Sequence, residues 1–356
     1  MPRADSRIDT LIVGQGLAGS LLAWELIKAG QRIVVVDNLH HASASMVATG
    51  IINPVTGPRM APCWRLEQLL GFARHTYRNL EEHLRIPFYR DLELVRIFCS
   101  EEERRLWMEK RTASGTNRFL GSMRPPGALS DSIRDPFGSF APGGSGRLDV
   151  PALVTAVAHF LEENGRLIQE RFSYDDLEIT ARHVRWREWK TDRVVFCEGF
   201  HGQANPWFSH LPFKSAKGEV LTLETSDVDL HRRIINQKKW LLPCPDGSFR
   251  AGSTYDWSTL NCESTLDGRN EILAALATFS RGTFKVTAQQ AGVRPVFKDY
   301  RPGIGFHPKL KHLAIFNGFG SKGALTIPWF AAHFSKVLTE GEDLDPEVDS
   351  RRFEGI

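Results

Sequence analysis

The sequence predicts an α/β protein, α+β overall, in which a parallel-sheet domain is interleaved with a second domain built on a mixed or antiparallel sheet. Three observations predict this class. A strand, a helix and a second strand follow one another within residues 9–38, strand and hairpin signals fill residues 218–257, and 356 residues are too many for a single small core. The composition, 42% hydrophobic and 24% charged, is that of an ordinary globular protein.

The N-terminal segment "DTLIVGQGLAGSLLAWELIKAGQRIVVVDN" carries the clearest pattern. The aliphatic run before Gly14 is typical of a strand buried on both faces. Gly14 permits a tight turn, Gly16 lets backbone approach a diphosphate, and Gly19 lets a helix pack closely on the strand. The second strand ends in Asp37, whose carboxylate can accept hydrogen bonds from a ribose. This order predicts a Rossmann-like dinucleotide-binding unit, but it does not separate NAD from FAD.

The next stretch, "NLHHASASMVATGIINPVTG" at residues 38–57, does separate the two cofactors. It is rich in small residues where a nicotinamide enzyme would begin its next regular element. With this stretch, the chain resembles the D-amino-acid oxidase superfamily of FAD-dependent oxidoreductases, which includes glycine oxidase and sarcosine oxidase. The resemblance implies that the stretch passes the diphosphate and runs along the isoalloxazine. His40 and His41 are expected to be loop residues rather than ligands.

Four later segments match the family in order, so the resemblance spans residues 9–338. They are "GRLDVPALVTAVAHFLEENGRLI", "DRVVFCEG", "AGVRPVFKDYRPGIG" and "NGFGSKGALTIPWFAAHFSKVL". The physics of the first is also legible by itself. Asp149 can cap a helix, Pro151 fits its first turn, and Gly165 can end it.

The resemblance implies FAD, held without a covalent bond. No Cys lies in "GVRPVFKDYRPGIG" and no His directly precedes "ATG", positions where some relatives tether the flavin. The cofactor-binding positions that the resemblance implies are Gly14, Gly16, Leu17, Ala18, Gly19, Asp37, Asn38, Ser43, Ser45, Thr49, Gly50, Gly199, Gly318, Gly320, Ser321, Lys322 and Gly323. Asp37 stands where relatives usually have glutamate, Glu198 where they have a small residue, and Glu219 where they often have glutamine. The roles of Glu198 and Glu219 stay open.

The predicted domains are interleaved along the chain. The FAD-binding domain is expected to take residues 7–85, 144–213 and 289–342, and the substrate domain residues 86–143 and 214–288. In the substrate domain, Pro245-Asp246-Gly247 predicts the turn of a hairpin. The acidic tail after Glu340 is expected to fray.

Four residues are candidates for the chemistry. Arg294, in "GVRP", matches the position where amino-acid-oxidising relatives place an arginine that binds the substrate carboxylate; an internal salt bridge is the alternative. Trp240 and Tyr255 match pocket-lining positions of glycine oxidase, with aromatic core packing as the alternative. Lys322, in the glycine-rich loop before the last helix, can add positive charge near the flavin, or it can be a solvated lysine.

The predicted function is FAD-dependent oxidation of the C–N bond of an amino acid or N-substituted glycine, with hydride transfer to flavin N5. Three alternatives stay open. "GIINPVTGPRM" and "GSKG" are also similar to the FAD domain of a bifunctional tRNA enzyme that removes the carboxymethyl group from a modified wobble uridine. The chain could also be a 2-hydroxy-acid dehydrogenase or a non-catalytic FAD-binding protein.

Charge and cysteine usage exclude several other classes. The family resemblance implies a small-molecule amine or amino-acid substrate. The net charge of +3 comes without a long basic tract, so tRNA is less favoured. Five cysteines without a Cys-x-x-Cys pair argue against a disulfide framework and against a metal site. No basic-then-apolar leader and no apolar run of membrane-spanning length occurs, so a cytoplasmic protein without a membrane partner is expected.

Overall fold

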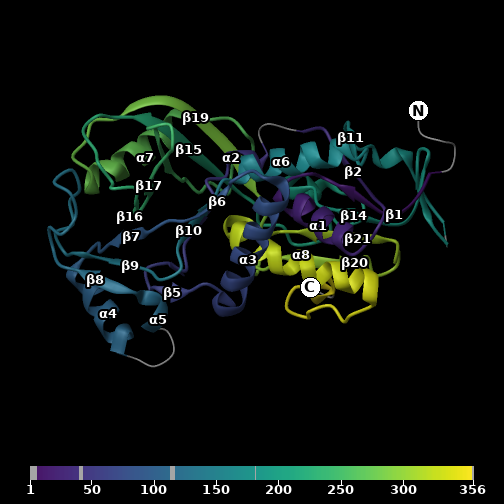
Figure 1. The fold of residues 1–356 in the computed structure, drawn as a ribbon, viewed down its shortest axis with the longest axis horizontal. Helices are drawn as coiled ribbons and strands as arrows, with labels where there is room; N and C mark the ends of the chain where they lie inside the picture. The colour runs from purple at the N-terminus through teal and green to yellow at the C-terminus, as the bar shows by residue number, and fades with distance from the viewer. Residues whose placement is uncertain (1–5, 40–42, 113–116, 181, 355–356) are drawn as a thin grey trace.

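The computed structural model describes residues 6–39, 43–112, 117–180 and 182–354, so His40 and His41 lie outside the described residues. The chain forms two lobes, each built on an eight-stranded sheet (Figure 1). The first strand and the last long helix belong to the same lobe, and the middle of the chain builds most of the other.

The first sheet has the parallel core that the N-terminal pattern predicts. Its strands are β1 (Ser6–Val13), β2 (Ile33–Asp37), β11 (Leu167–Gln169), β12 (Leu177–Ile179), β13 (Val184–Trp186), β14 (Trp189–Phe196), β20 (Gly303–Phe306) and β21 (Leu313–Asn317). The run β11-β2-β1-β14-β21 is parallel throughout, whereas β13 and β20 join it antiparallel. The carboxyl ends of the parallel strands therefore meet at one edge, where open α/β sheets bind their ligands.

Both faces of this sheet are buried, as the aliphatic runs predict. Leu11 and Val13 point into one core, and Ile12 points into another. Three helices cover the face that carries Ile12 (Figure 1): α1 (Leu17–Lys28), α6 (Val150–Glu163) and α8 (Gly323–Glu340). Large aromatic side chains, among them Trp186 and Phe208, fill the core on the opposite face.

The second sheet is mixed and almost entirely antiparallel. In spatial order its strands are β19 (Lys285–Arg294), β15 (Ala216–Glu224), β18 (Phe249–Gly252), β17 (Trp240–Pro243), β16 (Ile234–Asn236), β7 (Leu94–Ile97), β9 (Ser139–Ala141) and β8 (Ser122–Arg124). Only β7 and β16 run parallel to each other. Leu221 and Leu241 pack one face against Ile272 and Leu276 of helix α7 (Leu266–Phe279).

The remaining elements lie outside the two large sheets. A three-stranded sheet contains β3 (Ile51–Ile52), β10 (Gly146–Leu148) and β6 (Tyr89–Asp91), and β4 (Val55–Thr56) pairs with β5 (Ala61–Pro62). The remaining helices are α2 (Ala44–Val47), α3 (Leu66–Leu84), α4 (Glu101–Thr112) and α5 (Asn117–Leu120), with 3-10 turns η1 (Tyr174–Asp176), η2 (Gly199–Ala204), η3 (Gly320–Lys322) and η4 (Ser350–Phe353). Helix α3 lies between the lobes and contacts α8 and β6 (Figure 1).

The predicted fold class is confirmed, and so are its local signals. Asp149 caps α6 by accepting a hydrogen bond from the backbone N–H of Ala152 at 3.3 Å. The hairpin predicted around Pro245-Asp246-Gly247 is β17 and β18. The proposed domain boundary between residues 288 and 289 falls inside strand β19, and the division into five segments stays a prediction.

The expectation that the tail after Glu340 frays is wrong. Val348 is fully buried, and its carbonyl accepts a hydrogen bond from the backbone N–H of Ile304 at 2.8 Å. Asp345 forms an ion pair with Arg65. Asp345 of the tail therefore meets a basic partner on the first lobe, and Val348 completes its core.

Candidate active site

One large cavity, of about 790 Å³, lies where the two sheets face each other. This volume is within the range of small-molecule and cofactor sites. Most of the predicted site residues line it: Gly14, Gly16, Leu17, Ala18, Asp37, Asn38, Ser43, Ser45, Thr49, Gly50, Gly199, Trp240, Tyr255, Arg294, Gly320, Ser321 and Gly323. Gly19, Gly318 and Lys322 do not line it. The fold therefore gathers residues that are more than three hundred positions apart.

The turn after β1 is built by glycines in the way that its sequence predicts. Gly14 has φ +101°, and a Cβ placed on it would lie 2.5 Å from the carbonyl oxygen of Cys197. A Cβ on Gly19 would lie 1.8 Å from the carbonyl oxygen of Gly14. Gly19 therefore allows α1 to rest directly on the turn, which explains why it shapes the cavity without lining it.

The N-terminus of α1 opens into this cavity without a side-chain cap. The helix begins after Gly16, and only the backbone N–H of Leu17 is met by a side chain, the hydroxyl of Ser45 at 3.0 Å. Uncapped N–H groups and the helix dipole attract anions. Beside them, the Asp37 carboxylate accepts hydrogen bonds from the backbone N–H groups of Gln15, at 2.7 Å, and Leu39. This pairing holds the acid at the end of β2, where a ribose would reach it.

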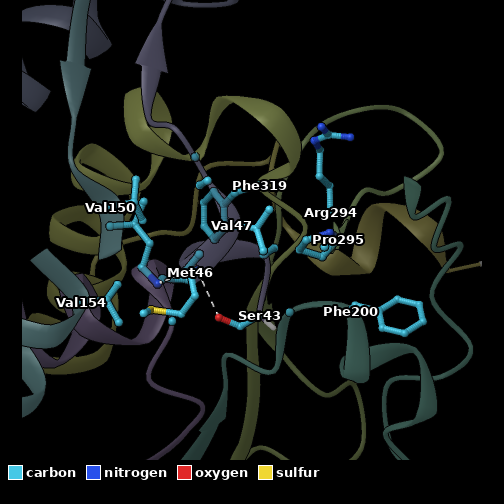
Figure 2. A pocket seen from close by; sticks show the side chains of 18 of the residues that line it. Ser43, Met46, Val47, Val150, Val154, Phe200, Arg294, Pro295 and Phe319 are labelled. Carbon is cyan, nitrogen blue, oxygen red and sulfur yellow. Dashed lines mark hydrogen bonds between the residues drawn. The ribbon is translucent and has the colours of Figure 1, made fainter. Parts of the chain in front are cut away.

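Residues 43–50 form the wall beside the turn. Ser43 caps the short helix α2 by accepting from the backbone N–H of Met46 at 3.3 Å. Gly50 has φ +66°, and a Cβ there would lie 1.8 Å from the carbonyl oxygen of Leu148. Figure 2 shows Met46 and the α6 residues Val150 and Val154 on one side of the pocket, so the wall is largely apolar.

A second helix N-terminus, that of α8, reaches the same cavity. Gly320, Ser321 and Gly323 line the cavity, and α8 also begins without a side-chain cap. The Lys322 ammonium donates to the Thr56 hydroxyl at 3.3 Å and does not line the cavity. The positive end of the α8 dipole therefore faces the cavity, while the lysine charge is directed to its rim.

These features fit FAD. The glycine turn leaves room for backbone to approach a diphosphate, the α1 N-terminus offers N–H donors, and Asp37 offers ribose acceptors. Apolar side chains follow where a flat ring system needs them. Gly14, Gly16, Asp37, Ser43 and Gly50 are therefore the residues that would hold it.

Arg294 projects into the cavity from the end of β19, on the opposite side from Val150 and Val154 (Figure 2). Its guanidinium donates to the Ser253 hydroxyl at 2.7 Å and to the Thr254 carbonyl at 3.4 Å. The Tyr255 ring lies 4.4 Å from its Cζ, a cation–π contact. Within the described chain, no carboxylate lies within 4.0 Å of this guanidinium, so the salt-bridge alternative is not supported there.

The surroundings of Arg294 keep its charge available. Burial lowers the pKa of the guanidinium below its ordinary value, although an arginine stays protonated at neutral pH. Gly218 on β15 lies directly beneath it, because a Cβ on Gly218 would be 2.1 Å from Nη2 of Arg294. A half-buried cation with neutral partners, facing the cavity, is suited to bind an anion.

Tyr255 and Trp240 occupy the same wall. The Tyr255 hydroxyl lies 2.9 Å from the Ser321 hydroxyl, so this side chain links the second sheet to the start of α8. Its ring is 48% exposed and stacks on Trp257. Trp240 is only partly buried and lines the cavity from β17. For both residues the pocket-lining role is the one that the geometry supports.

Glu198, whose role the sequence left open, also lines the cavity. Its carboxylate accepts hydrogen bonds from the Tyr174 hydroxyl at 2.5 Å and from the Asn205 amide at 2.8 Å. Burial raises the pKa of this carboxyl, and the two donors oppose the rise. Glu198 comes directly after Cys197, whose carbonyl lies against the Gly14 turn. Glu198 is therefore at the end of the cavity formed by the glycine turn, here called the dinucleotide end.

Sequence reasoning missed several polar residues of the cavity. Gln15 is buried inside the glycine motif, and its side-chain amide donates to the Ser20 hydroxyl and the Val154 carbonyl, both at 2.9 Å. Its position inside the "GQGLAG" motif is the sequence signal that could have placed Gln15 at the cavity. Asn236, Ser253 and Asn261 also line the cavity, but no local pattern marks them, because only the sheet brings them together.

Neither a metal site nor a membrane span is found in the described parts of the chain. Among them, no group of three or more His, Cys, Asp or Glu side chains is arranged to hold a metal ion. None of the helices in these ranges has the length and apolar character needed to cross a membrane.

Comparisons with known proteins agree with this geometry. A family model described as FAD dependent oxidoreductase matches residues 9–336. The uncharacterized oxidoreductase YurR of Bacillus subtilis (strain 168) is 22% identical over 359 residues, covering 94% of this chain and 96% of that protein. The tRNA 5-methylaminomethyl-2-thiouridine biosynthesis bifunctional protein of Azoarcus sp. (strain BH72) is 24% identical, and the match covers 95% of this chain but 58% of that protein. The crystal structure of glycine oxidase from Geobacillus kaustophilus superposes with a TM-score of 0.80 at 18% identity, covering 98% of this chain and 100% of the other.

Proposed function

The chain belongs to the family of FAD-dependent oxidoreductases, and from that premise we propose that it oxidises the C–N bond of an amino acid or an N-substituted glycine. It is therefore an enzyme that uses FAD. The observation that supports the proposed substrate is Arg294, a guanidinium without an acidic partner among the described residues, facing the cavity.

Arg294 would anchor the substrate through its carboxylate. The planar fork of a guanidinium matches a carboxylate, and two parallel charge-assisted hydrogen bonds fix both its distance and its orientation. Ser253 and the Tyr255 ring hold the fork from two sides, so little side-chain freedom is lost when the substrate binds. The α-carbon of the bound substrate is then held at a fixed distance from the wall.

The charge distribution of the cavity supports an amine that reacts as its free base. Among the described lining residues, the carboxylates are Asp37, Glu162 and Glu198, which come from β2, α6 and the end of β14. None comes from the second sheet. Arg294 would be neutralised by the substrate carboxylate, and no lining carboxylate of the second sheet is left to stabilise an ammonium group, so the cavity favours loss of the amine proton before reaction.

FAD supplies the acceptor for the two electrons that leave the substrate carbon as hydride. The contribution of this chain is geometry and field. The N-terminus of α8, with Gly320 and Ser321 in the cavity, directs the positive end of a helix dipole to a place where negative charge would develop.

Anaerobic reduction of the bound flavin tests this proposal. The purified protein is mixed with D- and L-amino acids, N-methylglycines and 2-hydroxy acids, and bleaching of the flavin absorbance is followed. We expect bleaching by one or more amines that carry a carboxylate. Arg294→Met should retain FAD and weaken the response to such substrates by about 100-fold or more, because a charged partner is lost from a buried pair. Arg294→Lys keeps the charge but loses the planar fork, so its response to these substrates should lie between those of the wild type and Arg294→Met.

The same experiment separates the alternatives. Bleaching by 2-hydroxy acids alone would indicate a hydroxy-acid dehydrogenase, and a protein that binds FAD but is bleached by none of these compounds would overturn the proposed function. Changed wobble-uridine nucleosides in tRNA from a deletion strain would instead favour the tRNA reaction.

A further inference from the structure

The face of β15 turned away from the cavity carries two charged residues that the proposed reaction does not use. Lys217 is 1% exposed and Glu219 is 3% exposed, and the Lys217 ammonium lies 3.8 Å from the Glu219 carboxylate. Their neighbours on that face, Leu221 and Leu223, pack in the core with α7. Burying a charged pair there costs hydration free energy, whereas an apolar pair of similar size would pack there without that cost.

Lys217 and Glu219 fasten one loop, residues 253–265, at several points. The backbone of Lys217 exchanges two hydrogen bonds with the backbone of Asp256, at 2.8 and 3.0 Å. The Glu219 carboxylate accepts from the Thr265 backbone N–H at 2.8 Å and from its hydroxyl at 2.7 Å. The Glu219 backbone N–H donates to the Thr254 hydroxyl at 2.9 Å. Both ends of the loop are therefore tied to β15.

The Lys217 side chain adds a contact in the middle of the loop. Its ammonium donates to Oδ1 of Asn261 at 2.9 Å. The backbone N–H of Glu263 donates to the same oxygen at 3.2 Å. Because an ammonium can only donate, this contact fixes which end of the Asn261 amide faces β15. The oxygen is occupied on that side. The amide nitrogen donates one N–H to the Glu263 carboxylate at 3.4 Å, and its second N–H can serve the cavity that Asn261 lines.

Asn261 belongs to the wall that holds Arg294. The guanidinium donates to Ser253 and Thr254, and Tyr255 covers its face, all at the beginning of the same loop. Asn261 and the neighbouring Cys262 continue this wall along the cavity. An N–H donor on the same wall as a guanidinium that lacks an acidic partner in the described chain can add to the affinity for an anionic ligand.

We propose that Asn261 is a substrate-binding residue that donates a hydrogen bond to the carboxylate held by Arg294, and that Lys217 is the positioning residue that orients it. Glu219 balances the buried charge of Lys217 and fastens the end of the loop. This inference rests on the proposed function. It also gives a role to Glu219, because a glutamine at that position could accept from Thr265 but could not offset the ammonium.

Binding of glycolate to the FAD-loaded protein tests the inference, followed by the change in flavin absorbance and by calorimetry. Asn261→Ala should bind glycolate about 10-fold more weakly, the effect of losing one hydrogen bond to a charged group. Lys217→Met should weaken binding to the same extent and also lower the melting temperature, because Glu219 is left buried without its counter-charge. FAD affinity should be unchanged in both.

The double variant Lys217→Met/Glu219→Gln separates positioning from stability. It removes both charges, so its melting temperature should recover toward that of the wild type, while its glycolate affinity should remain about 10-fold reduced. Lys285→Met is the matched control. Lys285 on β19 and Glu224 on β15 form an exposed ion pair at the far end of β15 from Lys217. Lys285→Met should bind glycolate as the wild type does.

Two results would overturn the inference: wild-type glycolate affinity in the double variant, or wild-type affinity in Asn261→Ala. Arg294→Met distinguishes this failure from that of the proposed function. If Arg294→Met loses glycolate while the other variants keep it, only the roles of Asn261 and Lys217 are wrong. If Arg294→Met binds glycolate as the wild type does, the carboxylate anchor itself is wrong.

Discussion

The two ends of the cavity are built in different ways. At the dinucleotide end, backbone forms the binding surface: a turn with Gly14 at φ +101°, an uncapped helix N-terminus, and one acid at the end of β2. At the opposite end, where we propose that the substrate binds (the substrate end), side chains form it: Arg294 from β19, Tyr255 and Asn261 from one loop, and Trp240 from β17. The first surface comes from about thirty consecutive residues, and the second from segments that only the sheet brings together.

This difference predicts how each end responds to substitution. A backbone surface cannot move out of the way of an added atom without changing the fold, whereas a long side chain can swing aside. Changes at the dinucleotide end should therefore alter stability and FAD binding together. Changes at the substrate end should alter substrate affinity and leave stability and FAD binding unchanged.

Gly19→Ala should have the largest effect. The added Cβ would lie 1.8 Å from the carbonyl oxygen of Gly14, and relief requires either the turn or α1 to move. We expect a loss of about 2–3 kcal/mol in the free energy of unfolding, together with loss of most of the bound FAD. Urea unfolding and the ratio of flavin to protein absorbance measure the two quantities.

Gly71→Ala is the matched control for this variant. Gly71 lies inside α3, and a Cβ there meets no atom within 4 Å. Alanine should stabilise that helix by about 0.5–1 kcal/mol, because glycine loses more backbone entropy on folding. A Gly19→Ala protein that is as stable and as yellow as the Gly71→Ala protein would contradict the rigidity assigned to the turn.

Gly218→Ala is the corresponding change at the substrate end, and its effect should be confined to substrate. The added Cβ would lie 2.1 Å from Nη2 of Arg294, so the guanidinium must leave its place beside Ser253. We expect carboxylate affinity to fall about 10- to 100-fold, with FAD content unchanged and the free energy of unfolding altered by less than about 1 kcal/mol. Loss of FAD in this variant would show that the two ends are not independent.

Asp37→Asn should give a smaller effect at the dinucleotide end. Asparagine keeps one oxygen for the backbone N–H of Gln15 or Leu39 but loses the negative charge and one acceptor. We expect FAD affinity to fall about 10-fold, measured by titration of the apoprotein, and the fold to be retained. An unchanged affinity would mean that the carboxylate serves the turn alone.

The same contrast explains what could be predicted from the sequence. The roles of Gly14 and Gly19 follow from backbone geometry, which a short motif records, and the structure has both glycines in the expected close contacts. Asp149 as a helix cap is equally local. The place of Arg294 was available only through the family resemblance, because its neighbours Ser253 and Tyr255 lie about forty residues away.

Where no local pattern or family motif exists, sequence reasoning failed for a physical reason. The place of Lys322 beside the flavin stays a prediction, because its ammonium donates to Thr56 and the motif does not say which way this long side chain points. Asn261 carries no signal, since its orientation depends on a buried lysine from another strand. The tail after Glu340 was expected to fray because it is acidic, yet its partner Arg65 lies far back in the chain.

The smallest effect is expected at Glu198, an acid at the dinucleotide end, where an anionic diphosphate would bind. Burial raises the pKa of its carboxyl above the ordinary 4.5. The folded protein therefore keeps this proton to a higher pH than the unfolded chain does. Between the two pKa values the folded state holds more protons, so the free energy of unfolding falls as pH rises through that window.

Glu198→Gln removes this dependence, because glutamine is neutral at every pH. The Tyr174 and Asn205 donors would then share a single acceptor oxygen, whereas a protonated carboxyl keeps a second oxygen that can still accept, so the variant should be less stable at low pH. We expect the deficit to shrink as pH rises above 4.5, the ordinary pKa of this carboxyl, measured by urea unfolding of the two apoproteins. Added FAD should steepen the change, because an ionised Glu198 repels a diphosphate that a protonated one tolerates. Parallel stability curves for the two proteins would place Glu198 outside the electrostatics of the dinucleotide end and leave it as a hydrogen-bond acceptor for Tyr174.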